Sequence, residues 1–185
     1  MGDAYHVEVP RVLHGRYVQV SWCYDHDMGA PWEEHDGHGP VRKSNGRHRK
    51  HDDKQPGERP LNAPNRHGYQ YYYDWELATK QAKRDGWGDH IDAFMHLTAS
   101  HRRVPTKGMI AEYAVEQDFQ RLRDWIDEKW HWCGIVATDL ETEVDASLWG
   151  IESDSDAEFI DECVSDLANE MWPQVLRALL QGDAA

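Results

Sequence analysis

A stretch of more than 40 residues without hydrophobic periodicity is the feature that most constrains how this 185-residue chain can fold. Between Asp25 and His67 neither a helical nor a strand period is present, and Gly, Pro, Asn, His and charged residues dominate. Structureless segments of this length are rare inside compact domains and are usually functional, disordered or organised by a ligand. We predict a single α+β domain over 1–185, with a long irregular loop or partly disordered insertion at 25–68.

Several flanking segments carry strand patterns. Residues 5–9 and 16–24 alternate between apolar and polar side chains, which predicts two antiparallel strands. The segment 130–139 is rich in β-forming residues, and 147–152 is its expected hairpin partner across a polar loop. A short aromatic run at 69–73 is a further candidate strand.

Helical spacing of apolar residues recurs elsewhere. It predicts helices over 74–86, 109–128 and 156–171, and a shorter one within 89–99. Ser155 and Glu158 form a capping box at the start of the last long helix, and Pro173 is expected to interrupt it. Its predicted buried residues are Phe159, Ile160, Cys163, Val164, Leu167 and Met171. Together these patterns predict an antiparallel sheet with 130–139 and 147–152, packed against two or three helices, including 109–128 and 156–171.

Charge is distributed unevenly along the chain. Residues 1–110 contain 16 Lys and Arg against 15 Asp and Glu, whereas residues 111–185 contain 4 against 19. A field of one sign steers association with oppositely charged partners. Because nucleic-acid binders usually present a basic stripe, direct nucleic-acid binding by the acidic 111–185 part is not expected. A solvated surface that only maintains solubility is the competing interpretation.

The acidic C-terminal part supplies the candidate partner-binding residues. No Lys or Arg occurs between Lys129 and Arg177, so no nearby basic residue in the sequence neutralises these carboxylates. The candidates lie in the predicted hairpin loop and around the last helix: Glu141, Glu143, Asp145, Asp154, Asp156, Asp161 and Glu162. We predict that they bind a protein that has a basic surface. The pattern does not predict an oligomeric state.

A second constellation, within 25–38, has the residue types of a metal site. Imidazole and carboxylate groups bind zinc and other divalent metals, and the candidate ligands are His26, His35, Asp36 and His38. A metal would also explain how a glycine-rich segment stays ordered. No cofactor is required by any sharper motif, however, and a hydrophilic solvated loop is the competing interpretation.

Three weaker signals remain. The basic residues Arg42, Lys43, Arg47, Arg49 and Lys50, with His48 and His51, could contact phosphate or fold back onto the protein's own carboxylates. Cys133 is a nominal nucleophile with His131 close by in the sequence, but we do not expect His131 to activate it, and we interpret Cys133 as a buried structural thiol. Of Trp130, Trp132 and Trp149, two are expected in the core. The common catalytic signatures are absent from the sequence, so catalytic residues are not assigned.

The compartment is inferred from the cysteines and the apolar runs. The three cysteines are an odd number and are widely spaced, which favours a reducing cytoplasm over a disulfide framework. The apolar runs are shorter than the roughly 20 residues that a membrane span needs, so no membrane association is expected. The acidic N-terminal segment does not have the pattern of a secretory signal.

Four blocks carry a resemblance to a known group of proteins. They are EHDGHGPV (34–41), YYYDWELATKQAKRDGWG (71–88), VEQDFQRLRDWIDEKWHWCGIVAT (115–138) and LWGIESD (148–154), and together they cover about a third of the chain. In these blocks the chain resembles a family of uncharacterised proteins of tailed bacteriophages and prophages. The resemblance implies an origin in a phage or prophage and a location in the cytoplasm of the host bacterium. It transfers no catalytic residues.

Two classes of function follow from these observations. The first is a small acidic, non-enzymatic protein that binds and modulates a host or phage protein, for example as an anti-defence inhibitor or a DNA-mimicking decoy. The second is a metal-dependent hydrolase or nuclease that uses the His- and Asp-rich loop at 25–38 to activate water. The binder is favoured because it uses the charge asymmetry and requires no further motif.

Overall fold

The chain forms two compact units. The computed structural model describes residues 4–44, 54–63, 69–88, 91–101 and 104–182. Unit 1 comprises Met1–Met28 and Trp130–Ala185, and unit 2 comprises Gly29–Lys129, so unit 2 is an insertion in the sequence of unit 1. Two compact units can still unfold as one cooperative domain, and the single-domain assignment therefore stays a prediction.

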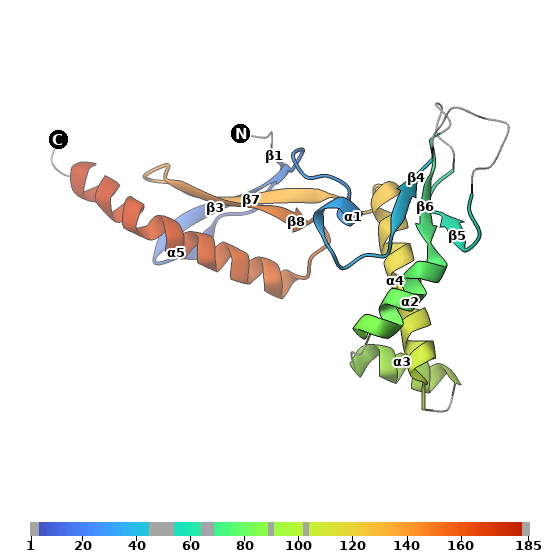
Figure 1. The fold of residues 1–185 in the computed structure, drawn as a ribbon. Coiled ribbons are helices and arrows are strands. Elements are labelled where there is room, and N and C mark those ends of the chain that lie inside the picture. Colours follow the sequence, from blue (N-terminus) through green and yellow to red (C-terminus); the bar gives the residue numbers. More distant parts are fainter. Residues whose placement is uncertain (1–3, 45–53, 64–68, 89–90, 102–103, 183–185) are drawn as a thin grey trace. The chain divides into compact units, whose positions relative to one another are not determined.

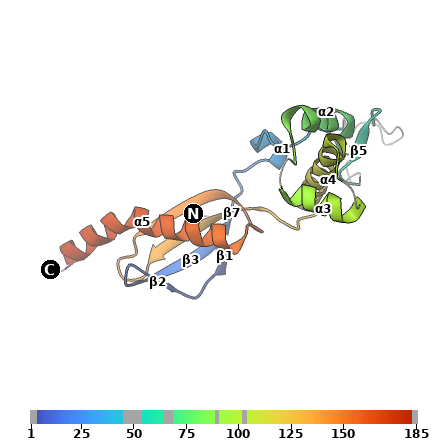
Figure 2. The same cartoon turned by 90° about the horizontal axis from the view of Figure 1, so that it is seen from below.

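Unit 1 is a five-stranded antiparallel sheet with one long helix. The strands are β1 (Ala4–Val7), β2 (Arg11–Leu13), β3 (Arg16–Tyr24), β7 (Trp132–Asp139) and β8 (Asp145–Glu152), in the order β1-β3-β7-β8 with β2 also paired to β3. Helix α5 (Ala157–Gly182) lies across one face of this sheet (Figures 1 and 2). The α+β class is confirmed, as are the predicted β7–β8 hairpin and the antiparallel pairing of the first strand with β3.

The core of unit 1 lies between the sheet and α5. Register places Val20 opposite Ala137 on the face that packs against the helix. The predicted apolar stripe of α5 is confirmed, since its residues are all less than 8% exposed: Ile160, Cys163, Val164, Leu167 and Met171. Phe159 was assigned wrongly to this stripe and is 45% exposed. It is next to Ile160, and successive helical residues point about 100° apart, so both cannot face the sheet.

Both predicted ends of the last helix need correction. The side chain of Asp156, rather than Ser155, accepts the hydrogen bond from the Phe159 amide, at 2.8 Å, and the helix begins at Ala157. Pro173 lies inside α5 and does not end it. A proline inside a helix costs about 3 kcal/mol. Burial of Val175, which is 0% exposed, continues the contact with the sheet beyond that proline and offsets the cost.

Unit 2 combines a three-stranded antiparallel sheet with helices (Figure 1). Its elements are α1 (Pro31–Glu34), β4 (Val41–Lys43), β5 (Glu58–Pro60), β6 (Tyr71–Asp74), α2 (Trp75–Asp85), α3 (Ile91–His101) and α4 (Lys107–Ile126). The sheet order is β4-β6-β5. The predicted loop at 25–68 thus contains α1, β4 and β5, which are too short for a hydrophobic period to reveal them. Residues 45–53 and 64–68 of that loop lie outside the described residues.

Helix α4 belongs to the core of unit 2. Its predicted apolar face is buried, with Val115 at 0% and Phe119 at 6% exposure, and it packs with Tyr73 of β6 and Ala78 of α2. The expectation that this helix packs on the sheet containing 130–139 is therefore wrong. A helical stripe identifies which face of a helix is buried, but it carries no information about the element that covers it.

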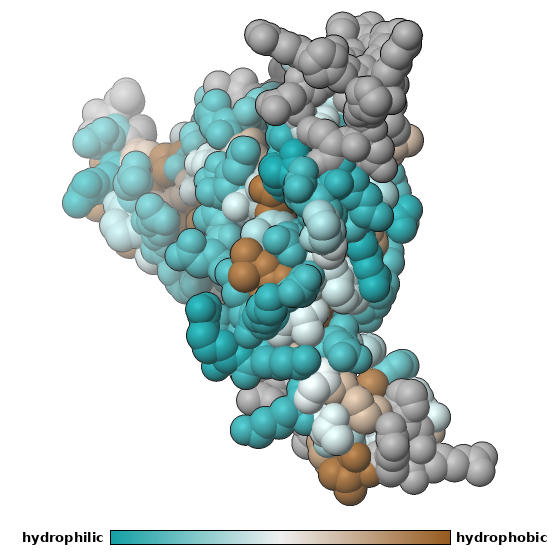
Figure 3. Space-filling view, turned by 45° about the vertical axis from the view of Figure 1, so that its right-hand side comes forward, coloured by the Kyte–Doolittle hydropathy of each residue, from teal (hydrophilic) through white to brown (hydrophobic). Residues whose placement is uncertain are grey.

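The face of the molecule drawn in Figure 3 is mainly hydrophilic. Figure 3 shows small, separate apolar areas, and the one at the lower end of the view lies over α3, where Phe94 is 39% and Met95 63% exposed. Scattered apolar side chains are normal on protein surfaces. In the part of the chain that the structure describes, no helix combines the length and apolarity needed to cross a membrane.

Candidate functional site

The turn between β7 and β8, residues 139–145, is called the hairpin tip. Its backbone closes through the Asp139 amide, which donates to the Val144 carbonyl, and the Glu143 amide, which donates to the Asp139 carbonyl, both at 2.9 Å. The Asp139 carboxylate accepts hydrogen bonds from the Thr142 amide and hydroxyl, each at 2.8 Å, and from the Glu141 amide at 3.2 Å. One aspartate thus organises the tip, as short acidic side chains commonly do in turns.

A buried ion pair anchors this aspartate. Arg16 donates from Nε to Asp139 Oδ2 at 2.6 Å and from Nη2 to Oδ1 at 2.7 Å, and the Asp139 side chain is only 1% exposed. The Arg16 guanidinium and the Thr142 donors hold the pKa of Asp139 well below its usual range. Arg16 Nη1 also lies 3.1 Å from Glu141 Oε2. No basic residue near Glu141 in the sequence neutralises it, but the fold supplies a basic partner from β3.

A pocket of about 620 Å³ opens beside the hairpin tip. Its lining consists of Val9, Pro10, Gly15, Arg16, Tyr17, Asp139, Leu140 and Glu141. Three apolar side chains at the pocket are largely open to solvent: Val9 is 85%, Tyr17 65% and Leu140 50% exposed. The volume lies within the range of about 300–1,000 Å³ that is typical of binding pockets.

The net charge of the chain lies entirely in unit 1. That unit contains 3 Lys and Arg against 17 Asp and Glu, whereas unit 2 contains 17 of each kind. All seven predicted partner-binding carboxylates are in unit 1, and all are exposed: Glu141, Glu143, Asp145, Asp154, Asp156, Asp161 and Glu162. The structure therefore places the whole net charge on unit 1, whereas the sequence analysis compared the charge of residues 1–110 with that of residues 111–185.

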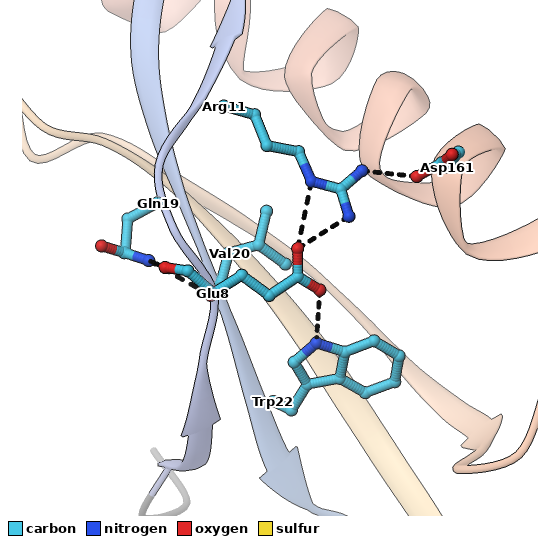
Figure 4. A network of polar contacts seen from close by, with 6 residues as sticks. All are labelled: Glu8, Arg11, Gln19, Val20, Trp22 and Asp161. Atoms are coloured by element: carbon cyan, nitrogen blue, oxygen red, sulfur yellow. Dashed lines mark hydrogen bonds and ion pairs between the residues drawn. The ribbon is translucent and has the colours of Figure 1, made fainter. Parts of the chain in front are cut away.

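Besides Glu141, at least two more of these carboxylates have intramolecular roles. Figure 4 shows Arg11 donating to Asp161 Oδ1 at 2.5 Å and to Glu8 Oε2 at 2.7 Å. Trp22 donates from its indole nitrogen to the other Glu8 oxygen at 2.8 Å. Arg11 thus joins β2 to α5 through Asp161, and Asp156 caps α5 as described above. These contacts leave Glu143 and Asp145 of the hairpin tip as the better candidates for a partner.

The predicted metal ligands divide between the two units. His26 is in unit 1, where its ring stacks on Tyr24 at 5.9 Å, while His35, Asp36 and His38 are in unit 2. Among the described residues, no group of three or more His, Cys, Asp or Glu side chains is arranged to hold a metal ion. Metal binding stays a prediction, with no observation that favours it.

His38 instead takes part in a buried network that the sequence did not reveal. Its Nδ1 lies 2.6 Å from Asp118 Oδ1, and the Asp118 Oδ2 atom accepts from the Tyr73 hydroxyl at 2.6 Å and the Gly39 amide at 2.8 Å. A Cβ atom at Gly39 would lie 2.4 Å from the Tyr73 oxygen, so only glycine fits there. In the sequence, the glycines on either side of His38 were the one signal that could have indicated this network. This network joins the loop before β4 to α4 and β6.

Removal of the Tyr73 hydroxyl tests this network. Burial, together with Asp118, raises the pKa of Tyr73. The folded state therefore keeps the proton that an unfolded tyrosine releases above a pKa of about 10. The stability from this group is present below pH ~10 and falls as the pH rises further. We expect Tyr73→Phe to cost about 1–2 kcal/mol at neutral pH and to reduce the alkaline loss.

Urea unfolding at neutral pH and at about pH 10.5 would measure both effects. Tyr17→Phe is the matched control, because the Tyr17 side chain is 65% exposed. Equal stability of wild type and Tyr73→Phe at neutral pH would contradict a stabilising role for the network.

The basic segment is described only at its start. Arg42 donates from Nε and Nη2 to the two carboxylate oxygens of Glu58, both at 2.8 Å, and the Nζ of Lys43 lies 5.1 Å from the centre of the Tyr69 ring. The other residues of the predicted phosphate-contacting stretch lie outside the described residues: Arg47, His48, Arg49, Lys50 and His51. Arg42 thus folds back onto a carboxylate of unit 2, and phosphate contact stays a prediction.

The thiols and tryptophans agree with their structural interpretation. Cys23, Cys133 and Cys163 are all free and buried. Burial raises the pKa of the Cys133 thiol to about 11, which disfavours the nucleophilic thiolate. Trp130 and Trp132 are 1% and 4% exposed, while Trp149 is 40% exposed, so the prediction of two core tryptophans is confirmed.

Comparisons with known proteins add no family. A scan against protein-family models, a search of curated proteins and a search of solved structures each returned no match. The resemblance to phage proteins is thus untested, and the functional argument rests on the geometry of the site.

Proposed function

We propose that unit 1 is a non-enzymatic binding module that recognises a basic surface on another protein through the hairpin tip. The observation that carries this proposal is the location of the whole net charge of −14 on unit 1, with exposed carboxylates on a tip that a buried ion pair holds in place. A rigid surface of one sign accelerates association with an oppositely charged partner and selects against acidic ones.

The backbone of the tip gives separate support. Glu143 adopts a φ of +58°, in the left-handed region that favours glycine or asparagine. A non-glycine residue in a sparsely populated region costs of order 1 kcal/mol, and such costs are concentrated at functional sites. A glutamate at this position adds charge to the exposed tip in spite of that backbone cost.

The kind of partner follows from the charge and the resemblance. A basic protein of the phage or of its bacterial host, in the host cytoplasm, is the partner we propose. Where that partner normally binds DNA, the carboxylates of unit 1 would take the place of phosphates, which is the chemistry of an anti-defence inhibitor or decoy.

Charge reversal at the tip tests the proposal. We expect Glu143→Lys with Asp145→Lys to slow association with the captured partner by at least tenfold at low salt, because like charges then face each other. Wild-type association should slow steeply as ionic strength rises through about 0.15 M, where the Debye length is near 8 Å. The measurement is capture from bacterial lysate, followed by association kinetics with the purified partner at several salt concentrations.

The matched control reverses two exposed carboxylates of unit 2, Glu112→Lys with Asp127→Lys, and changes the net charge by the same amount. A site at the tip predicts near-normal association for this control. If both double variants slow association equally, the effect belongs to net charge alone and the proposed site is wrong.

A further inference from the structure

We infer that the pocket beside the hairpin tip takes up one large apolar side chain of the partner, so that the recognised segment carries an apolar residue flanked by Lys or Arg. This inference rests on the proposed function and names the chemistry of the partner. Neither the charge nor the pocket alone would specify such a segment.

The pocket has the apolar walls that such a side chain requires. Val9, Tyr17 and Leu140 expose between 50% and 85% of their surface and stand around a volume of about 620 Å³. Burying a large apolar side chain against such walls is favourable by roughly 25 cal/mol per Å² of apolar surface. Tyrosine is also enriched among the residues that dominate binding energy at protein interfaces.

The apolar surface continues along the sheet from the pocket. Register pairs Val12 with Tyr17, and Leu13 and Val18 belong to the core beneath α5. Since neighbouring strand residues alternate between faces, Val12 and Tyr17 point away from α5. Val12 is 63% exposed, so this patch is open to solvent and extends the apolar wall beyond the pocket.

Hydrogen bonds and an ion pair connect the residues that line the pocket. The Leu140 amide donates to the Tyr17 carbonyl at 3.0 Å, which joins the two walls. The Arg16–Asp139 ion pair joins two further lining residues, and the Asp139 carboxylate accepts a hydrogen bond from the Thr142 amide in the turn that follows. A preformed site avoids much of the entropy cost of ordering side chains and loops during binding.

The charges at the pocket and the hairpin tip determine which residues of the partner can flank the apolar side chain. Arg16 is the one basic residue of the lining, and Asp139 and Glu141 already engage its Nε, Nη1 and Nη2 atoms. An anionic ligand would therefore compete with two carboxylates, one of them buried. Glu143 and Asp145, exposed on the adjacent tip, favour Lys or Arg on either side of the inserted residue.

Three fluorescein-labelled peptides test the inference on the full chain by fluorescence polarisation. The first has a tryptophan between two pairs of lysines, the second has glycine in place of that tryptophan, and the third has the tryptophan between pairs of glycines. We expect the lysine–tryptophan peptide to bind at least tenfold more tightly than either of the others. Only this peptide has both the side chain for the pocket and the charges for the tip.

Variants locate the effect. Leu140→Ser, or Val9→Ser as a second pocket variant, should remove the preference for tryptophan over glycine and leave binding of the lysine–glycine peptide unchanged. Both side chains are at least half exposed, so neither change should unfold the protein. Leu148→Ser is the matched control, because Leu148 is 41% exposed and lies outside the pocket lining.

The outcomes separate the two proposals. Equal binding of the tryptophan and glycine peptides that carry lysine would overturn the pocket inference and leave the proposed function standing. Equal binding of the charged and uncharged tryptophan peptides would overturn recognition by charge instead. Binding of none of the three peptides would overturn both.

Discussion

Replacement of Asp139 by alanine is expected to lower the free energy of unfolding of unit 1 by about 3 kcal/mol. The substitution leaves Arg16, which is 15% exposed at its side chain, without its two strongest acceptors. It also leaves the amide and hydroxyl of Thr142 without their acceptor in the turn. Removing one member of a buried ion pair costs far more than the pair itself contributes, because the remaining charge stays desolvated.

The same ion pair predicts a dependence on acidic pH. The pKa of Asp139 in the folded protein lies below the value of about 3.9 expected in the unfolded chain. The carboxylate therefore contributes its full stabilisation above pH ~4, and this contribution is lost as the pH falls through that value towards the lower folded pKa. Stability curves of wild type and Asp139→Ala should accordingly converge on acidification.

Denaturant unfolding between about pH 2.5 and 7 measures both effects, with Asp145→Ala as the control because Asp145 is an exposed carboxylate of the same turn. That control should change the stability by less than about 0.5 kcal/mol. A double variant, Arg16→Met with Asp139→Ala, should be less destabilised than Asp139→Ala alone, because it leaves no buried charge. A difference between wild type and Asp139→Ala that stays constant across this pH range would contradict the role of the ion pair.

Local patterns were sufficient for much of unit 1. The β7–β8 hairpin and the buried stripe of α5 follow from alternation and helical spacing, which a short sequence window contains. The contacts that shape the site are of another kind. Arg16 and Asp139 are separated by 123 residues, and Arg11 and Asp161 by 150, so no local pattern could pair them.

The insertion explains why the charge pattern was only partly interpretable from the sequence. Asp25 donates its amide to the Trp132 carbonyl at 3.1 Å, where the chain leaves and re-enters unit 1 around residues 29–129. A division of the sequence at residue 110 therefore assigned α4 to the acidic part, although its buried residues belong to unit 2. The carboxylates of the hairpin tip could be proposed from their spacing, but the pocket beside them required β3 and the residues before β2.

Truncation of one core residue in each unit should separate the behaviour of the two units. Leu167 is 4% and Phe119 6% exposed, and they belong to two distinct hydrophobic clusters. Leu167→Ala and Phe119→Ala should each cost about 3 kcal/mol, from lost apolar burial and the cavity that remains. Because the two clusters are distinct, we expect each substitution to weaken only the unit that contains it, in contrast to the single domain predicted from the sequence.

Amide hydrogen exchange followed by NMR reads out each unit separately. Leu167→Ala should accelerate exchange in β3 and β7 and leave α2 and α4 unchanged, whereas Phe119→Ala should do the reverse. Leu180→Ala is the control for unit 1, since Leu180 is 75% exposed and its loss should leave no cavity. Accelerated exchange in both units after either core substitution would mean that residues 1–185 unfold as one cooperative domain. Accelerated exchange in only one unit would instead mean that the two units unfold separately. The fold of unit 1, which carries the hairpin tip and the pocket, would then not depend on unit 2.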